Sequence, residues 1–204
     1  MKKVAIVDYG MCNLDSVFRA VEECGGNPVV TGKARDFECA DYIILPGVGA
    51  FANAMHQLRQ RSLDAVLQKQ VIDKQIPFLG ICLGMHLMAK KGWEGGETEG
   101  LGFIDGEVRH LRPDSSHTRL PHVGWNEVVY VKESSLFNGI RSGKDFYFVH
   151  SYHLCCSEEN VIARTPYCGE FVSAISDGLT FGVQFHPEKS QRLGLQVLRN
   201  FLSI

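Results

Sequence analysis

Residues 76–84 read Ile76-Pro77-Phe78-Leu79-Gly80-Ile81-Cys82-Leu83-Gly84, an apolar stretch that ends in a cysteine between two glycines. A short apolar run predicts a buried strand. A sharp turn from strand to helix needs small residues two positions on either side of its apex, because larger side chains there would collide. Gly80 and Gly84 meet that requirement. The stretch therefore predicts a strand, a turn that exposes Cys82, and a helix.

The first half of the chain alternates further strands with helical periodicity. Strands are predicted at residues 4–7, 29–30, 42–45 and 76–81. Apolar residues recur at helical spacing after Asn13, a possible N-cap, with Gly25-Gly26 as the stop, and a second helix follows Ser62. Strands that alternate with helices predict a parallel sheet with helices on both faces.

The second half consists of short strands between turn signals. These strands are predicted at residues 106–111, 127–131, 145–149, 161–164, 171–175 and 180–185. Ser190 is a candidate cap for a last helix, and the segment 92–102, rich in glycine and glutamate, is predicted to be a mobile loop. We expect an α/β fold: one domain, 1–204, with a mixed, largely parallel central sheet flanked by helices and extra antiparallel strands in the second half.

Size and composition favour a globular enzyme. The 204 residues are 45% hydrophobic and 22% charged, which suits one sizeable core. The net charge is -2 and the basic residues are scattered, so nucleic acid is not expected as a partner. The N-terminal apolar run is too short for a signal peptide and no run is long enough to span a membrane, so we expect a cytoplasmic location. The seven cysteines are an odd number and are expected to be reduced.

Two further patterns do not favour a metal or a cofactor. The run from His150 to Cys156 contains histidines and cysteines, but alternation along one strand would place His150 and Tyr152 opposite His153 and Cys155. Pro46-Gly47-Val48-Gly49 lacks the third glycine of a dinucleotide fingerprint. We therefore expect neither a metal nor a cofactor.

Three segments at predicted strand ends carry candidate chemistry: Cys82, His186-Pro187-Glu188 and Pro46-Gly47-Val48-Gly49. Ligands of open α/β sheets bind outside the carboxyl ends of the strands. In an extended segment His186 and Glu188 would face the same way, so His186 can act as a base that Glu188 orients. The helix N-terminus favours a thiolate at Cys82. Each segment alone has a plainer interpretation, as a buried cysteine, an ordinary turn or an ordinary loop, but together they predict a cysteine nucleophile in one crevice.

These segments, with others along nearly the whole chain, resemble the class I (triad) glutamine amidotransferases. The matching stretches are residues 8–11, 46–51, 80–85, 121–126, 147–152 and 181–190. Pro121-His122-Val123-Gly124-Trp125-Asn126 and His186-Pro187-Glu188-Lys189-Ser190 resemble, more narrowly, the glutaminase subunit of imidazole glycerol phosphate synthase. The resemblance implies a flavodoxin-like fold, hydrolysis of glutamine through a thioester, and passage of ammonia to a (β/α)8-barrel cyclase subunit. The 204 residues leave no room for a synthase domain, so a partner chain is expected.

The resemblance also assigns roles by position. Cys82, His186 and Glu188 match the catalytic triad, and Val48, Gly49 and Leu83 match the oxyanion environment. The residues implied to approach the substrate glutamine are Gly47, His86, Ser151 and Tyr152. The residues implied to face or gate the partner are Asn13, Trp125, Tyr147 and Lys189.

Two positions depart from the family pattern. His86 stands where the family usually has a glutamine that contacts the substrate, which predicts weaker glutamine binding with the chemistry retained. Cys12 stands where the family usually has glycine, which predicts backbone strain and altered docking. Three alternatives stay open: a paralogous glutaminase that feeds another acceptor, such as a surface-glycan sugar; a catalytically weak binding subunit; and a cysteine hydrolase that acts alone.

Overall fold

A computed structural model describes residues 2–11, 13–113 and 118–204. Cys12, with its predicted effect on docking, lies outside the described residues.

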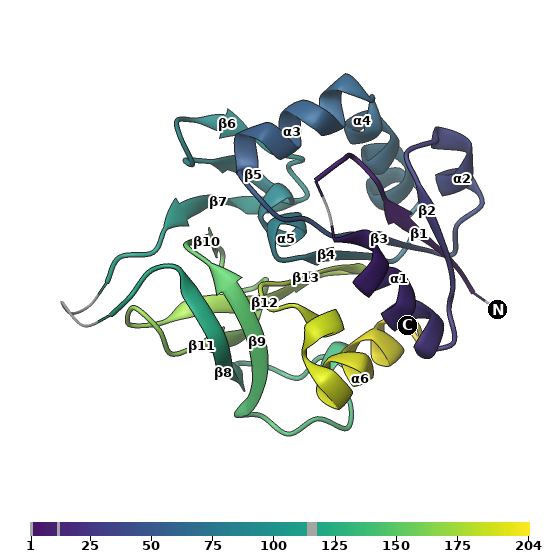
Figure 1. The fold of residues 1–204 in the computed structure, drawn as a ribbon. Coiled ribbons are helices and arrows are strands. Elements are labelled where there is room, and N and C mark those ends of the chain that lie inside the picture. Colours follow the sequence, from purple (N-terminus) through teal and green to yellow (C-terminus); the bar gives the residue numbers. More distant parts are fainter. Residues whose placement is uncertain (1, 12, 114–117) are drawn as a thin grey trace.

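In this described part, nine strands form one mixed sheet in the order β2-β1-β3-β4-β13-β12-β11-β8-β9 (Figure 1). The strands are β1 (Lys3–Val7), β2 (Asn27–Thr31), β3 (Tyr42–Leu45), β4 (Phe78–Ile81), β8 (His122–Tyr130), β9 (Lys144–His150), β11 (Val161–Thr165), β12 (Phe171–Asp177) and β13 (Thr180–Val183). Pairing is parallel from β2 to β13 and antiparallel from β13 to β9. The predicted mixed α/β class is confirmed.

Helices cover both faces of the parallel half. On one side lie α1 (Leu14–Glu23) and α6 (Gln191–Phe201), and on the other α3 (Phe51–Gln60), α4 (Leu63–Leu67) and α5 (Leu83–Leu87). Along β1, Val4 and Ile6 pack into the cluster beneath α1 and α6, whereas Ala5 and Val7 pack into the cluster beneath α3 and α4. This alternation follows from the two-residue period of a strand. Helix α2 (Ala34–Glu38) and a π-helical turn (Gln68–Asp73) complete the second layer.

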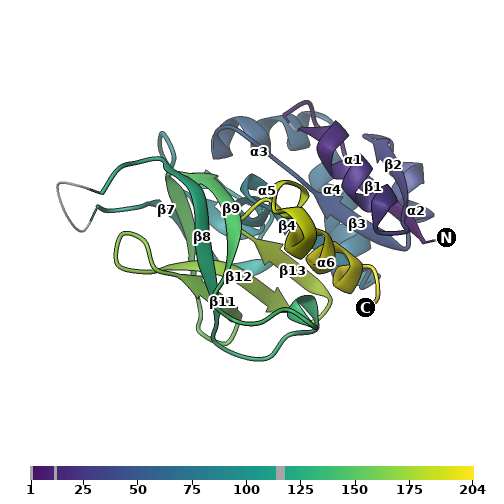
Figure 2. The same ribbon diagram turned by 60° about the horizontal axis from the view of Figure 1, so that its bottom comes forward.

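A second, four-stranded sheet has the order β10-β7-β5-β6. Its strands are β5 (Ala89–Gly92), β6 (Thr98–Glu99), β7 (Ile104–His110) and β10 (Tyr152–Cys156). β5 and β6 pair antiparallel, with Lys91 opposite Glu99, so the predicted loop 92–102 contains the turn of a hairpin and the short strand β6. Figure 2 shows the antiparallel strands β8, β9, β11 and β12 extending away from the half that the helices cover.

Three other predictions of strand bounds need correction. β8 begins at His122, five residues before the predicted start, and β13 ends at Val183, before Gln184 and Phe185. The run from His150 to Cys156 is not one strand, because the chain leaves β9 at His150 and enters β10, in the other sheet, at Tyr152. The alternation assumed for the histidines and cysteines of that run is therefore wrong.

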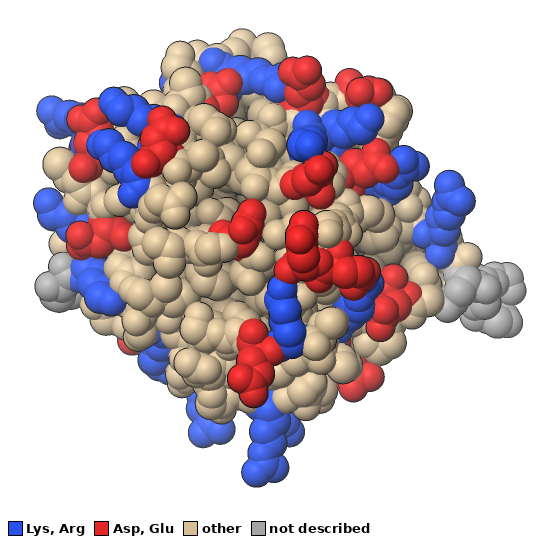
Figure 3. Space-filling model, turned by 180° about the vertical axis from the view of Figure 1, so that it is seen from behind, with Lys and Arg blue, Asp and Glu red and all other residues tan. Residues whose placement is uncertain are grey.

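The surface carries charges of both signs. On the face in Figure 3, Lys and Arg side chains alternate with Asp and Glu side chains, and uncharged residues lie between them. Across residues 2–11, 13–113 and 118–204, no helix is long and apolar enough to cross a membrane.

Candidate active site

Cys82 lies at the apex of a sharp turn between β4 and α5. Its backbone has φ of 53° and ψ of -108°, and residues other than glycine rarely adopt such a positive φ. A Cβ atom on Gly80 would lie 2.7 Å from the carbonyl oxygen of Gly84, and one on Gly84 would lie 1.7 Å from that of Leu45. Only glycine fits at either position, and this explains the spacing in the sequence.

His186 and Glu188 reach the same edge of the sheet from β13. This strand is the parallel neighbour of β4, with Val183 in register with Ile81, so both strands end beside Cys82. His186 Nδ1 lies 2.8 Å from Glu188 Oε1, and both side chains are buried. The two residues share this orientation through a 3-10 turn (Pro187–Lys189), and not through the extended backbone that the sequence predicted.

The environment of His186 favours its protonated form. Burial alone lowers the pKa of His186, but its interactions with Cys82 and its hydrogen bond with Glu188 outweigh burial and raise that pKa to about 10. Nε2 makes no hydrogen bond of standard geometry with any described residue, although the nearby Cys82 side chain raises the pKa of the ring. The arrangement suits an imidazolium beside a thiolate.

Ser190 holds His186 against β9. Its hydroxyl donates to the carbonyl of His186 at 2.7 Å and accepts from the amide of Tyr147 at 3.0 Å. The amide of His186 in turn donates to the carbonyl of Tyr147 at 2.9 Å. Ser190 stands at the N-cap position of α6, but its side chain does not cap the helix as predicted, because the hydroxyl is used in this triangle.

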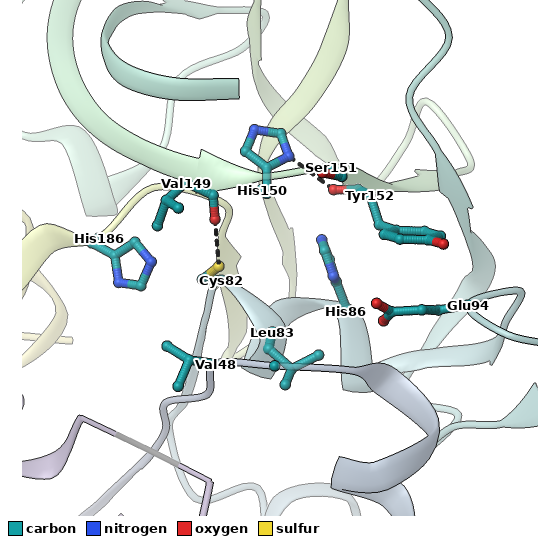
Figure 4. Close-up of a pocket in the computed structure, with 11 residues that line it drawn as sticks. Val48, Cys82, Leu83, His86, Glu94, Val149, His150, Ser151, Tyr152 and His186 are labelled. Atoms are coloured by element: carbon teal, nitrogen blue, oxygen red, sulfur yellow. Dashed lines mark hydrogen bonds between the residues drawn. The ribbon is translucent and has the colours of Figure 1, made fainter. Parts of the chain in front are cut away.

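A cavity of about 280 Å³ opens above the sulfur (Figure 4). Six of the predicted oxyanion and substrate residues line it together with Cys82 and His186, namely Val48, Gly49, Leu83, His86, Ser151 and Tyr152. Glu94, which was not among the predicted residues, also lines the cavity, and its Oε2 accepts a hydrogen bond from the amide of Phe51 at 2.7 Å. Glu94 lies on the β5–β6 hairpin in a segment that also contains Glu97 and Glu99, so nothing in the sequence singled it out.

The predicted oxyanion segment is only partly directed at the cavity. The amide of Val48 donates to the carbonyl of Met11 at 3.1 Å, so it would have to leave Met11 before it could face a substrate oxygen. Gly49 has φ of 104°, which only glycine adopts readily. Gly47 lies behind the cavity wall, where a Cβ atom would be 2.3 Å from Tyr9 Oη. Close packing, more than substrate contact, explains glycine at position 47.

Comparisons with known proteins agree with this geometry. The model of the family "Glutamine amidotransferase class-I" matches residues 5–204. The chain belongs to the class I glutamine amidotransferases. A relative from Campylobacter jejuni strain 81-176, named imidazole glycerol phosphate synthase subunit HisH 1, is 44% identical over 97% of this chain and 98% of its own length. The HisH subunit from Moorella thermoacetica is 46% identical over 98% of this chain and 94% of its own length.

Solved structures show the same amidotransferase fold. A putative GMP synthase protein from Thermoplasma acidophilum has a TM-score of 0.73 and 21% identity, and covers 100% of this chain and 93% of its own. PurLQS from Thermotoga maritima has a TM-score of 0.73 and 20% identity, and the match covers 100% of this chain and 99% of the PurLQS chain. At this level of identity the likeness concerns the fold alone.

Behind the cavity of this amidotransferase runs a chain of hydrogen bonds. His150 Nδ1 donates to the carbonyl of Tyr152 at 2.8 Å, so neutral His150 accepts at Nε2 from His122 Nδ1 at 3.0 Å. His122 then accepts at Nε2 from the side-chain amide of Asn126 at 3.2 Å. Burial lowers the pKa of His122 to about 4 and that of His150 to about 3, which keeps both rings neutral. The chain fixes the backbone where the cavity wall passes from β9 to β10.

Three of the residues predicted to meet a partner lie together at the surface. Trp125 is 48% exposed and its ring lies 6.1 Å from that of Tyr147, while Lys189 Nζ lies 5.9 Å from the Tyr147 ring. Asn13 directly precedes α1, and α1 contacts the turn that carries Lys189. Among the described residues, no group of three or more His, Cys, Asp or Glu side chains is placed to hold a metal ion.

Proposed function

We propose that this chain is the glutaminase subunit of an imidazole glycerol phosphate synthase and releases ammonia from glutamine by means of Cys82, His186 and Glu188. The observation that carries the proposal is the nucleophile turn, which places Cys82 beside a buried His186–Glu188 pair at the floor of a cavity. The reaction domain would be the single unit 1–204. The cysteines of the described residues are all free, as is typical of a reducing compartment, which supports a cytoplasmic location.

In the proposed reaction, the Cys82 sulfur attacks the side-chain amide carbon of glutamine and the carbonyl oxygen becomes an oxyanion. His186 Nε2 holds the thiol proton and passes it to the leaving nitrogen as the C–N bond breaks, which releases ammonia and leaves a thioester. A water molecule then gives its proton to His186, attacks the thioester, and releases glutamate and the thiol. Glu188 holds Nδ1 throughout. The amides of Leu83 and Gly49 are the proposed oxyanion donors, and that of Val48 joins them once it has left Met11.

The cavity suits a small amino acid. Glu94 lies beyond His86 as seen from Cys82 (Figure 4), so its carboxylate can bind the α-ammonium group while the side-chain amide reaches the sulfur. Ser151 and Tyr152 supply polar groups along the opposite wall. The volume of about 280 Å³ fits a ligand of this size better than a peptide or a glycan.

The proposed partner is a (β/α)8-barrel cyclase subunit, which would use the ammonia to form imidazole glycerol phosphate and aminoimidazole carboxamide ribotide. The relatives named above are subunits of that synthase. The Trp125–Tyr147–Lys189 cluster supports the proposal, because an exposed tryptophan with an aromatic neighbour and a cation is typical of a binding surface.

Glutamate release from glutamine tests the function, measured with and without the cognate cyclase and its nucleotide ligand. We expect slow release alone, faster release in the complex, and none from Cys82→Ala. Turnover by Cys82→Ala would remove the nucleophile. If the wild type released glutamate at the same rate with and without the cyclase, the result would instead favour a glutaminase that supplies another acceptor.

A further inference from the structure

Gln184 touches the sulfur of Cys82 from inside the protein. It follows β13 two residues before His186, it is fully buried, and its backbone amide donates to the carbonyl of Ser173 at 2.9 Å. Its side-chain Nε2 lies 3.7 Å from Cys82 Sγ, within reach of a hydrogen bond to sulfur. The Val149 carbonyl lies 3.8 Å from the same sulfur, but it can only accept a hydrogen bond and cannot donate one.

His86 holds the other end of the same amide. His86 Nε2 lies 2.6 Å from Gln184 Oε1, and the backbone amide of His86 donates to the carbonyl of Cys82 at 3.2 Å. Burial lowers the pKa of His86 to about 4, so the ring is neutral near pH 7 and carries one N–H. Because Oε1 can only accept, the short contact places that N–H on Nε2.

The orientation of the amide matters for the state of the sulfur. With Oε1 toward His86, the amide NH2 group points at Cys82 and can donate to a thiolate. With the amide reversed, Oε1 would face the sulfur and could meet only a thiol S–H. The structure has the first orientation, with Oε1 2.6 Å from His86 Nε2, and a neutral His86 that carries its proton on Nε2 is the tautomer that matches it. A buried N–H donor stabilises an anion more than a neutral group.

We propose that Gln184 stabilises the Cys82 thiolate by donating its side-chain N–H to the sulfur, and that His86 is a positioning residue that fixes the direction of that amide. The proposal rests on the proposed function in taking Cys82 as the nucleophile. It concerns the reactivity of the sulfur before any substrate binds. The titratable groups around this sulfur include His186, His86 through Gln184, and His150 across the cavity, and Glu94 and Tyr152 line the same cavity.

Alkylation by iodoacetamide at pH 7 tests the proposal without glutamine, with the rate followed on the Cys82 peptide by mass spectrometry. Gln184→Glu keeps an acceptor for His86 but has no N–H, and Gln184→Met removes both groups at similar volume. We expect either change to slow the alkylation of Cys82 about 3- to 10-fold, because the reagent reacts with the thiolate. A packing defect would act in the opposite direction, since a more exposed sulfur is alkylated faster.

Two other variants separate the roles. His86→Leu should slow alkylation, while His86→Gln, which restores an N–H donor, should return the rate to within about 2-fold of wild type. Ser173→Ala is the matched control, because its buried hydroxyl has no hydrogen-bond partner among the described residues and does not touch the sulfur. Wild-type alkylation in both Gln184 variants would overturn the inference. If the Gln184 variants slow alkylation but the wild type does not hydrolyse glutamine, the inference about the Cys82 thiolate is supported and the proposed function is wrong.

Discussion

His86 lines the cavity at the position where the sequence predicts a departure from the family pattern. Its Nε2 is committed to Gln184, which leaves only Nδ1 for a ligand. A carboxamide at this position offers both a donor and an acceptor on a longer side chain. We expect His86→Gln to lower the KM for glutamine by about 5-fold or more, the effect of about 1 kcal/mol of polar contact.

Steady-state glutamate release in the complex measures this effect. His56→Gln is the control, because His56 is exposed on α3. An unchanged KM in His86→Gln would show that position 86 does not contact the substrate.

Gly84 cannot be replaced by another residue without a steric clash. A Cβ atom there would lie 1.7 Å from the carbonyl oxygen of Leu45, and the backbone of β3 cannot move away without disturbing the sheet. We expect Gly84→Ala to lower the free energy of unfolding by about 3 kcal/mol or more. Urea unfolding measures this loss. Gly139→Ala, at a glycine with φ of 75° and open space around it, should cost only about 1–2 kcal/mol.

At the level of elements, the triangle of Ser190, His186 and Tyr147 joins the start of α6 to β9. Without the Ser190 hydroxyl, the amide of Tyr147 loses its acceptor and the His186 backbone loses a donor. We expect Ser190→Ala to lower kcat about 10-fold with little change in KM, because the base is misplaced while the cavity walls remain.

Ser203→Ala is the matched control for this variant. Its hydroxyl also donates to a backbone carbonyl near α6, that of Arg199 at 2.8 Å, but far from His186 in sequence. Ser190→Thr, which keeps the hydroxyl, should recover much of kcat. An equal fall of kcat in Ser203→Ala would indicate a general effect of α6.

Some elements around the site could be predicted from the sequence and others could not. The β4–Cys82–α5 turn was predictable, because steric exclusion at Gly80 and Gly84 leaves a local signature. The β5–β6 hairpin was not, because its strands are short and polar and form only against β7. The break at Ser151 was also hidden, because two consecutive strands of similar composition join different sheets. Glu94 and Gln184 were missed since their roles depend on side chains distant in the sequence.

For the whole molecule, the buried histidines make stability depend on pH. His86, His122 and His150 have pKa values lowered by burial to between about 3 and 4, below the ordinary value near 6.5. Between pH 6.5 and pH 4 these histidines bind protons in the unfolded chain but not in the folded chain. Stability is therefore lost as the pH falls through this range. Each histidine contributes at most about 1.4 kcal/mol per pH unit.

Urea unfolding at pH 7 and pH 5 measures this loss. We expect a marked loss of stability at pH 5, and a smaller loss in His122→Phe than in wild type. His56→Gln should leave the difference between the two pH values unchanged. Equal stability of the wild type at both pH values would contradict the prediction.

The pairing of β4 with β13 places the nucleophile and its base at the ends of two adjacent strands, with Val183 opposite Ile81. A ladder of backbone hydrogen bonds can be built by almost any sequence, whereas a contact between side chains depends on particular residues. Substitutions in the core around β4 and β13 should therefore leave the separation between the ends of these two strands largely unchanged. Homologues in which the packing of the core changes during evolution would fold in lower yield. Each molecule that does fold would keep its turnover number.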